Sequence, residues 1–173
     1  AKGSYKNFVN SFNYSYLKAT YQSSGELFGG DRNIDIIPGT KIAGLPEHTV
    51  KLKSIWIPNE KLNIGGTLIT TSSIVTQGNE DGKIGLDDDT YNVDTKIDGY
   101  SILNLFLNYK PKKKLDYFIR ISNVFDTRFK TYGLMATSLF NSSGNLLSTD
   151  PTVNVFAAPG MPRLITLGFR YKY

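Results

Sequence analysis

Hydrophobic and polar residues alternate along the last eleven residues of the chain, 163–173. From Ile165 to Tyr173 every second residue is apolar or aromatic, and the residues between them are small or cationic. A period of two predicts a β-strand whose two faces have very different surroundings. At ~3.3 Å per residue such a strand is about 36 Å long, and a tilt of about 45° would let it cover roughly 25 Å.

The same alternation predicts further strands along the whole chain, and no stretch shows a helical period. In the second strand Lys51 and Lys53 alternate with apolar residues, which suits a wet interior better than a packed core. In the third strand Gly65-Gly66 indicates a bulge or a close backbone approach. Two segments, 134–140 and 146–156, could form an additional hairpin. The six predicted strands are 4–22, 48–57, 62–73, 99–109, 115–125 and 163–173.

Long and short connections alternate between these strands. The long ones are 23–46, 76–97 and 127–162, and the short ones are 58–61 and 110–114. A compact domain seldom contains several structureless loops of this length. A transmembrane barrel does, because it keeps short turns on the periplasmic side and long loops outside. We therefore predict an all-β fold of about six antiparallel transmembrane β-barrel strands, with long extracellular loops and short periplasmic turns.

The composition removes several classes of function. Among 173 residues there is no cysteine, which excludes disulfides, zinc–thiolate sites and cysteine nucleophiles, and no apolar run is long enough for a transmembrane helix. Tyrosine is abundant, with 11 copies, and favours membrane interfaces. The net charge is +5, but the only dense basic run, 110–114, lies in a short turn, so nucleic acid is not expected as a partner.

The candidate chemical sites are weak. His48 is the sole histidine, so neither a metal site nor a Ser-His-Asp arrangement can be built around it, and we expect a strand-end residue at the outer rim. The segment 79–98 holds seven acids but lacks the EF-hand spacing. A solvated loop is the favoured interpretation of this segment, with cation bridging or repulsion of anionic ligands left open. We expect no enzymatic activity, no cofactor and no metal ion.

Four short motifs resemble TonB-dependent outer-membrane receptors. The stretch NVFDTRF at 123–129 is similar to the end of that family's penultimate strand, and APGMPR at 158–163 resembles the approach to its last strand. LPEHT at 45–49 and YSYLKA at 14–19 resemble two earlier strand landmarks. The four occur in the family's order and together span the chain.

This resemblance implies a 22-stranded barrel with an N-terminal plug domain, which imports scarce solutes with energy from TonB. Residues 1–173 would be a single segment, the C-terminal part of the barrel, without the plug. The implied solute is a ferric chelate of siderophore, citrate or haem type. The implied location is the bacterial outer membrane, with the C-terminus in the periplasm. The implied partners are membrane lipid, the remainder of the barrel and plug, TonB through the plug, the barrel-assembly machinery and the chelate.

Two groups of residues follow from strand alternation combined with the resemblance. Phe169, Tyr171 and Tyr173 resemble the C-terminal signal read by the barrel-assembly machinery, or form an aromatic girdle, and the two roles are compatible. A second group would face the lumen, where it would attract anionic chelates, pair with acids of the plug, or merely solvate the wall beside local carboxylate partners. These basic residues are Lys51, Lys53, Arg120, Arg170 and Lys172.

Two other classes of protein remain as alternatives. A small closed outer-membrane barrel acting as a passive pore or an enzyme would need at least eight strands. A soluble β-sandwich binding module would have to cover its long apolar faces.

Overall fold

The computed structural model describes residues 1–29, 32–83, 96–141, 143–146 and 152–173. Within these ranges every regular element is a β-strand. The strands are β1 (Lys2–Tyr5), β2 (Phe8–Tyr16), β3 (Gly25–Gly29), β4 (Arg32–Ile36), β5 (His48–Asn59), β6 (Leu62–Thr71), β7 (Ile74–Val75), β8 (Lys96–Ile97), β9 (Tyr100–Lys112), β10 (Leu115–Ser122), β11 (Lys130–Ser138), β12 (Thr152–Pro159) and β13 (Leu164–Tyr171). No helix in the described ranges has the length and apolarity needed to cross a membrane.

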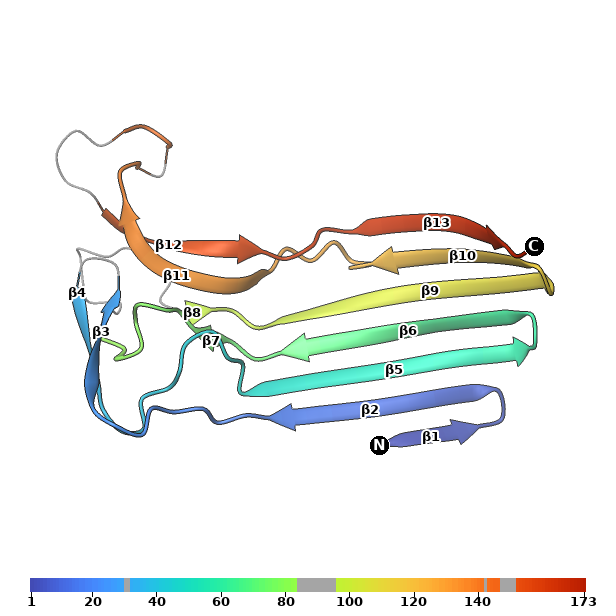
Figure 1. Cartoon of the computed structure of the whole chain (residues 1–173), viewed down its shortest axis with the longest axis horizontal. Coiled ribbons are helices and arrows are strands. Elements are labelled where there is room, and N and C mark those ends of the chain that lie inside the picture. The colour runs from blue at the N-terminus through green and yellow to red at the C-terminus, as the bar shows by residue number, and fades with distance from the viewer. Residues whose placement is uncertain (30–31, 84–95, 142, 147–151) are drawn as a thin grey trace.

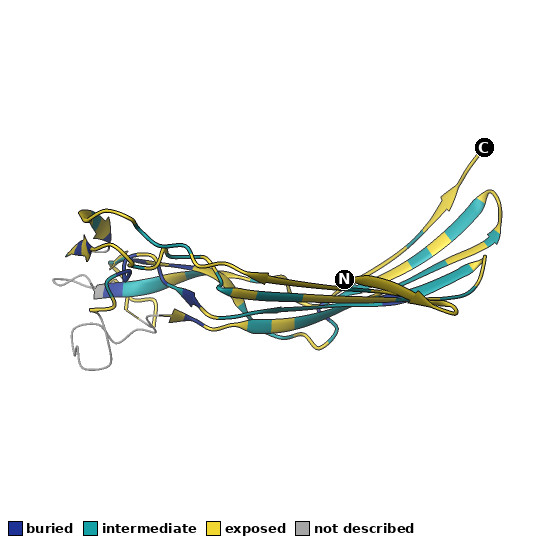
Figure 2. Ribbon diagram, turned by 90° about the horizontal axis from the view of Figure 1, so that it is seen from below, coloured by how far each residue is buried: buried dark blue, intermediate teal, exposed yellow. Residues whose placement is uncertain are grey.

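One long antiparallel sheet organises the chain. Its strand order is β1-β2-β5-β6-β9-β10-β13 (Figure 1). Within this sheet each strand pairs with the sheet strand that comes next along the chain. The short turns lie at one end of this sheet, and the long connections lie at the other end, where they form the pairs β3–β4, β7–β8 and β11–β12. The sheet is visibly curved when seen from below (Figure 2). The predicted all-β, antiparallel architecture with alternating connections is confirmed.

Several boundaries differ from the sequence prediction. The stretch 4–22 is not one strand, because the chain reverses at Lys6 and Asn7 and divides β1 from β2. Lys6 adopts a φ of 50°, which the alternation of side chains does not reveal. The loop 23–46 contains the hairpin β3–β4, and the proposed hairpin after residue 130 exists as β11–β12. The turn near 110 is shorter than expected, since β9 continues to Lys112.

The strand register collects the apolar residues on one face of the sheet, here called the apolar face. Phe12 pairs with Leu52, Leu52 with Leu68, and Leu68 with Leu103. Nearer the short turns, the row Trp56, Ile64, Leu107, Ile119 and Leu167 crosses five strands. Within the part of the chain that the structure describes, no second layer covers this face: Phe12 is 44% exposed and Leu167 is 68% exposed. A contiguous apolar surface of this kind marks contact with lipid or another apolar partner.

The opposite face, here called the polar face, carries asparagine, threonine and charged residues together with two aromatic rings that cover glycines. A Cβ atom added to Gly65 would lie 2.6 Å from the ring of Phe106 and 2.8 Å from the carbonyl oxygen of Ser54. A Cβ atom added to Gly168 would lie 2.4 Å from the ring of Phe118. The register is unbroken at Gly65, so this glycine allows a close approach and does not mark a bulge.

The buried core lies among the loops, not within the sheet. Arg32 and Asp81 form the ion pair that joins the β3–β4 hairpin to the segment after β7. The glycines at 29 and 78 approach closely there, since a Cβ atom on Gly29 would meet Gly78 at 2.6 Å. The apolar residues buried at this end are Ile34, Ile36, Ile74, Ile97, Met135 and Val153.

The sheet order begins at β1 and ends at β13, and these two strands do not pair with each other. The described residues therefore do not close a barrel by themselves. This arrangement disfavours the small closed barrel and fits a segment of a larger wall.

Candidate functional site

Four of the five predicted basic residues share the polar face, and the fifth, Lys172, lies just beyond the end of β13. Lys51 lies opposite Asn13 and Ile69, and Lys53 lies opposite Ser11 and Thr67. All of these positions alternate with the apolar face, so the side chains of Lys51 and Lys53 leave the sheet on its polar side.

Arg120 and Arg170 leave the sheet on the same side. Arg120 lies opposite Phe106 and Thr166, and its guanidinium group is 5.3 Å from the ring centroid of Phe118. Arg170 lies opposite Asp116. Lys172 follows the last residue of β13, and its backbone N–H donates to the carbonyl oxygen of Lys114 at 2.8 Å.

These cations do not form a cluster. Two strands, β6 and β9, separate β5 from β10, which at ~4.8 Å per strand puts the lysines of β5 about 14 Å from Arg120. The polar face is therefore a wall with dispersed positive charge. A binding site for a compact ligand has to be sought elsewhere, near the loops.

The aromatic residues of β13 lie on the apolar face. Phe169 lies opposite Tyr117, and Tyr171 lies opposite Leu115. Phe169 is 70% exposed, and the rings of Tyr171 and Tyr173 meet edge to face at 5.7 Å. The aromatic girdle and the assembly signal both stay predictions for these residues.

The sole histidine is the first residue of β5. The hydroxyl group of Tyr14 and Nδ1 of His48 are hydrogen-bonded at 2.9 Å, and the ring centroid of Tyr16 is 5.2 Å from that of His48. The three rings form an aromatic group at the long-loop end of the apolar face. No group of acids, histidines or cysteines in the described ranges could hold a metal ion.

The loop between β10 and β13 has a tightly bonded neck, here defined as residues 123–129 and 158–163. Asn123 is 2% exposed and has a φ of 51°, a left-handed conformation that asparagine tolerates better than most residues. Its Nδ2 donates to the carbonyl oxygens of Thr127 at 2.9 Å and Met161 at 3.0 Å, and its Oδ1 accepts the N–H of Thr127 at 3.0 Å.

Further bonds close the same neck. Oδ1 of Asp126, itself at a φ of 54°, accepts the N–H of Arg163 at 2.8 Å. The ring of Phe129 lies against Gly160, where an added Cβ atom would be 2.2 Å away, and the N–H of Gly160 donates to the carbonyl oxygen of Phe129 at 2.8 Å. Two motifs that are far apart in the sequence are thus bonded to each other in space.

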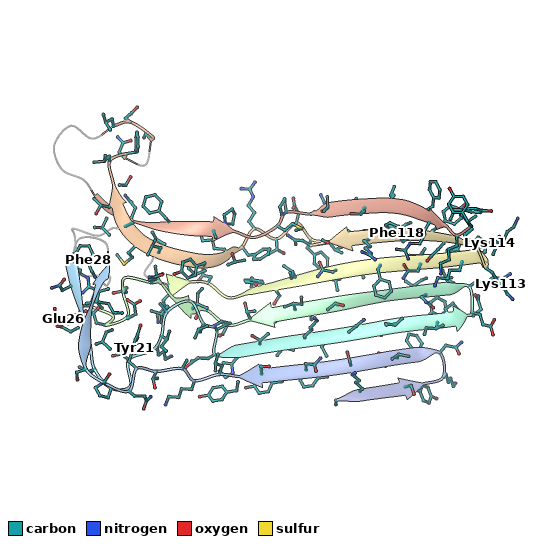
Figure 3. All side chains as sticks on the ribbon, in the orientation of Figure 1. Tyr21, Glu26, Phe28, Lys113, Lys114 and Phe118 are labelled. Atoms are coloured by element: carbon teal, nitrogen blue, oxygen red, sulfur yellow. The ribbon has the colours of Figure 1, made fainter. Side chains whose placement is uncertain are left out.

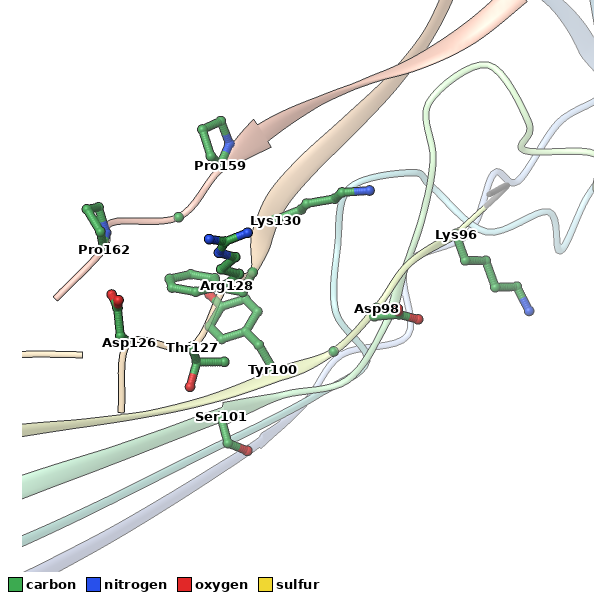
Figure 4. A pocket seen from close by; sticks show the side chains of 13 residues that line it. Lys96, Asp98, Tyr100, Ser101, Asp126, Thr127, Arg128, Lys130, Pro159 and Pro162 are labelled. Atoms are coloured by element: carbon green, nitrogen blue, oxygen red, sulfur yellow. The ribbon is translucent and has the colours of Figure 1, made fainter. Parts of the chain in front are cut away.

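A pocket of about 790 Å³ lies beside this neck, between the start of β9, the start of β11 and the end of β12 (Figure 4). The rings of Tyr100 and Phe129 pack at 4.2 Å along one side of it. Cationic side chains outnumber acidic ones around the pocket. Its charged lining residues are Lys96, Asp98, Asp126, Arg128 and Lys130.

Sequence reasoning missed the pocket, although Arg128 and Phe129 belong to one of the recognised motifs and Pro159, Gly160 and Pro162 belong to another. The motifs served only as landmarks of the family. Nothing in the alternation pattern indicates that 126–130 and 159–162 form one side of a pocket whose other side begins at Lys96.

The β3–β4 hairpin is fastened to the acidic segment by a forked ion pair. Nη1 and Nη2 of Arg32 donate to the two carboxylate oxygens of Asp81 at 2.8 and 2.6 Å. This hydrogen bonding with Arg32 lowers the pKa of Asp81 below its usual value of 3.8. Lys83 pairs with Asp35 of β4, and Asp35 raises the pKa of Lys83.

This contact corrects part of the expectation for the acidic loop. Glu80 is buried and its Oε2 accepts the N–H of Gly78 at 2.9 Å, and the side chain of Asp81 is 4% exposed in its ion pair with Arg32, so this part is not freely solvated. Residues 84–95 of the predicted loop lie outside the described residues, and its last two residues form β8.

Comparison with known proteins identifies the family to which this sheet is similar. The family described as "TonB dependent receptor-like, beta-barrel" matches residues 2–124. No curated protein matches the chain.

Solved structures match nearly its whole length. The siderophore receptor PiuA from Acinetobacter baumannii superposes with a TM-score of 0.68 at 15% identity, over 99% of this chain and 20% of that one. The ferric-catecholate import receptor Fiu from E. coli, in its closed form, gives 0.61 at 20% identity, over 95% and 19%. The ferric yersiniabactin uptake receptor FyuA from Yersinia pestis gives 0.60 at 13%, over 96% and 21%. The chain thus spans about a fifth of the length of these structures, and the likeness establishes the fold.

Proposed function

The chain belongs to the TonB-dependent receptor β-barrel family, and from that premise we propose that it forms the C-terminal wall of a receptor that takes up a ferric chelate. Members of this family are non-enzymatic transporters, and the family implies an outer-membrane location. Residues 1–173 supply one segment of the wall, and the remaining strands and the plug complete the receptor.

The observation that carries the proposal is the separation of the two faces of the sheet. The apolar face is continuous from β2 to β13 and stays exposed in the described chain, as lipid contact requires. The polar face then faces the lumen, with Lys51, Lys53, Arg120 and Arg170 along it. In this orientation the long loops are extracellular, and the short turns and the C-terminus are periplasmic.

The pocket beside the neck supplies a binding surface for the solute. Lys96, Arg128 and Lys130 favour an anionic ligand, and the paired rings of Tyr100 and Phe129 offer a flat apolar surface. Oδ1 of Asp126 already accepts the backbone N–H of Arg163, and this hydrogen bond partly compensates the negative charge that Asp126 brings to the pocket. An anionic ferric chelate with planar donor groups, of siderophore, citrate or haem type, matches this combination of charge and rings.

The same proposal names the partners. TonB acts on the plug and not on this wall, and the barrel-assembly machinery reads Phe169, Tyr171 and Tyr173. The three solved structures named above are siderophore or ferric-chelate receptors by their names, which supports an iron chelate as the first class of solute to test.

The test is uptake of radiolabelled iron chelates by bacteria that express the full-length polypeptide containing this chain. Uptake of at least one anionic chelate should depend on that polypeptide and disappear in a strain without TonB. Uptake that continues without TonB would contradict the proposal. Steady conductance of the purified protein in a planar bilayer would favour a passive pore.

A further inference from the structure

The short-turn end of the sheet is strongly basic. Three backbone hydrogen bonds tie its turns together: Ile57 N–H to the carbonyl oxygen of Asn7 at 2.7 Å, Lys110 to Lys61 at 2.7 Å, and Lys172 to Lys114 at 2.8 Å. All the lysines that project here are exposed, and Figure 3 shows Lys113 and Lys114 at this end. We call this set the basic rim: Lys6, Lys61, Lys112, Lys113, Lys114 and Lys172.

The basic rim has few internal counter-charges. Glu60 and Asp116 are the acidic side chains nearest in sequence to the turns. Asp116 is approached by Lys110, at 3.9 Å, and not by a member of the rim. Among the described residues no basic-rim lysine has a carboxylate within ion-pair distance. The positive charge of the rim is therefore available to an external partner.

Aromatic residues on the apolar face mark the depth in the membrane at which the external partner of the basic rim lies. Trp56 and Phe8 stack with ring centroids 6.3 Å apart, and Tyr109, Tyr117 and Phe169 pair with one another in the next apolar row towards the short turns. Such rings locate the boundary between hydrocarbon and lipid headgroups. The basic rim begins one to a few residues beyond them, at headgroup depth.

A β-bulge turns one lysine towards the lipid. Tyr117 pairs with Tyr109, but Leu115 pairs with Lys112, so Lys110 and Pro111 together oppose the single residue Asp116. Without the extra residue Lys112 would share the polar face, three positions after Tyr109. The bulge places it on the apolar face, opposite Leu115 and in line with Tyr171. A lysine here can lay its methylene chain on lipid and extend its ammonium group to the headgroups.

From these four observations we propose that the basic rim binds the phosphate groups of anionic phospholipids in the leaflet next to the short turns. Each lysine attracts a net negative headgroup, whereas a zwitterionic headgroup such as phosphatidylethanolamine gains much less. The inference rests on lipid contact by the apolar face and is independent of the solute that the receptor carries.

The test uses the full-length polypeptide containing this chain, purified in mild detergent and exposed to equal amounts of phosphatidylglycerol and phosphatidylethanolamine. Native mass spectrometry counts the retained lipids. The wild-type protein should retain phosphatidylglycerol preferentially, and raising the salt concentration should reduce this preference because salt screens exposed charges. Equal retention of the two lipids, or a preference insensitive to salt, would overturn the proposal without any variant.

Three variants locate the site. Replacing Lys112, Lys113 and Lys114 with glutamine should lower the preference by about tenfold, and replacing all three with arginine should preserve it. The matched control, Lys51→Gln with Lys53→Gln and Arg120→Gln, removes three charges from the polar face and should leave the preference unchanged. An unchanged preference in the glutamine triple, or an equal loss in the control, contradicts a site at the basic rim. If the wild-type protein keeps the lipid preference but takes up no iron chelate, only the proposed transport function is contradicted.

Discussion

The side-chain amide of Asn123 donates a hydrogen bond to the carbonyl oxygen of Met161 at 3.0 Å, across 38 residues of sequence. This bond joins the end of β10 to the approach to β13 and so closes the loop that carries β11 and β12. The neck that this bond closes leads directly into the last strand, which pairs with β10. The same neck lines the pocket, so it also shapes the candidate binding surface.

We expect Asn123→Ala to destabilise the folded barrel by about 2–4 kcal/mol, because it removes three part-buried hydrogen bonds and leaves alanine in a left-handed conformation. The measurement is urea unfolding of the full-length protein in detergent, followed by the electrophoretic shift of the folded form. Asn108→Ala, on β9 and outside the neck, is the control and should cost far less. Equal costs for the two variants would contradict a special role for the neck.

The adjacent glycines of β6 should respond differently to enlargement. Gly65→Val directs its side chain into the ring of Phe106 and the carbonyl oxygen of Ser54, and should cost about 1–3 kcal/mol. Gly66→Val points to the apolar face, where the nearest atom would be 3.0 Å away on the flexible Leu105 side chain, and should be nearly neutral. The same unfolding assay compares them. Adding Phe106→Ala to Gly65→Val should recover part of the loss, and no recovery would refute the ring clash.

The ion pair between Arg32 and Asp81 should make the loop region sensitive to acid. Because pairing lowers the pKa of Asp81, its stabilising contribution is fully present above the usual value of 3.8 and is lost as the pH falls through the lowered folded-state pKa. Protection of the β3–β4 hairpin against hydrogen exchange, taken relative to the intrinsic exchange rate at each pH, should therefore fall only below about pH 4. Asp81→Asn should produce fast exchange already at pH 7. Unchanged exchange in that variant would show that the pair does not fasten the hairpin.

The pocket should select for negative charge. Arg128→Gln combined with Lys130→Gln should weaken binding of an anionic ferric chelate about tenfold or more, with a smaller effect at high salt. Equilibrium binding of the chelate to the full-length protein measures the change. Lys112→Gln combined with Lys113→Gln, at the opposite end of the sheet, serves as the charge-matched control. A loss as large in the control as in the pocket variant would argue against the pocket.

The last strand should act in assembly through its aromatic face. Replacing Phe169 and Tyr171 with alanine should slow the appearance of folded receptor in the outer membrane severalfold, since alternate side chains of an added strand carry its recognition. Pulse-chase labelling of the folded form follows the rate. Arg170→Gln, between them on the polar face, should leave the rate unchanged. Normal assembly of the aromatic variant would leave these residues only the girdle role.

Much of the fold follows from alternation alone. A period of two fixes which residues share a face, so the stretches around Leu52, Leu105 and Leu167 already define one apolar surface before any pairing is known. The family is likewise visible in short motifs such as that at 123–129, and the match over residues 2–124 confirms it. The reversal at Lys6 was missed because a turn that depends on one residue with positive φ leaves no mark on the hydrophobic pattern.

Only the tertiary structure determines the contacts between residues that are far apart in the sequence. Sequence alternation placed Lys51 and Arg120 on one face, but only the strand order shows that two strands keep them apart. Likewise Asn123 and Met161 are unrelated in the sequence, and their bond exists because β10 pairs with β13. Local periodicity determines the direction of a side chain, whereas contacts between separate segments depend on register, bulges and loop closure, which no local pattern encodes.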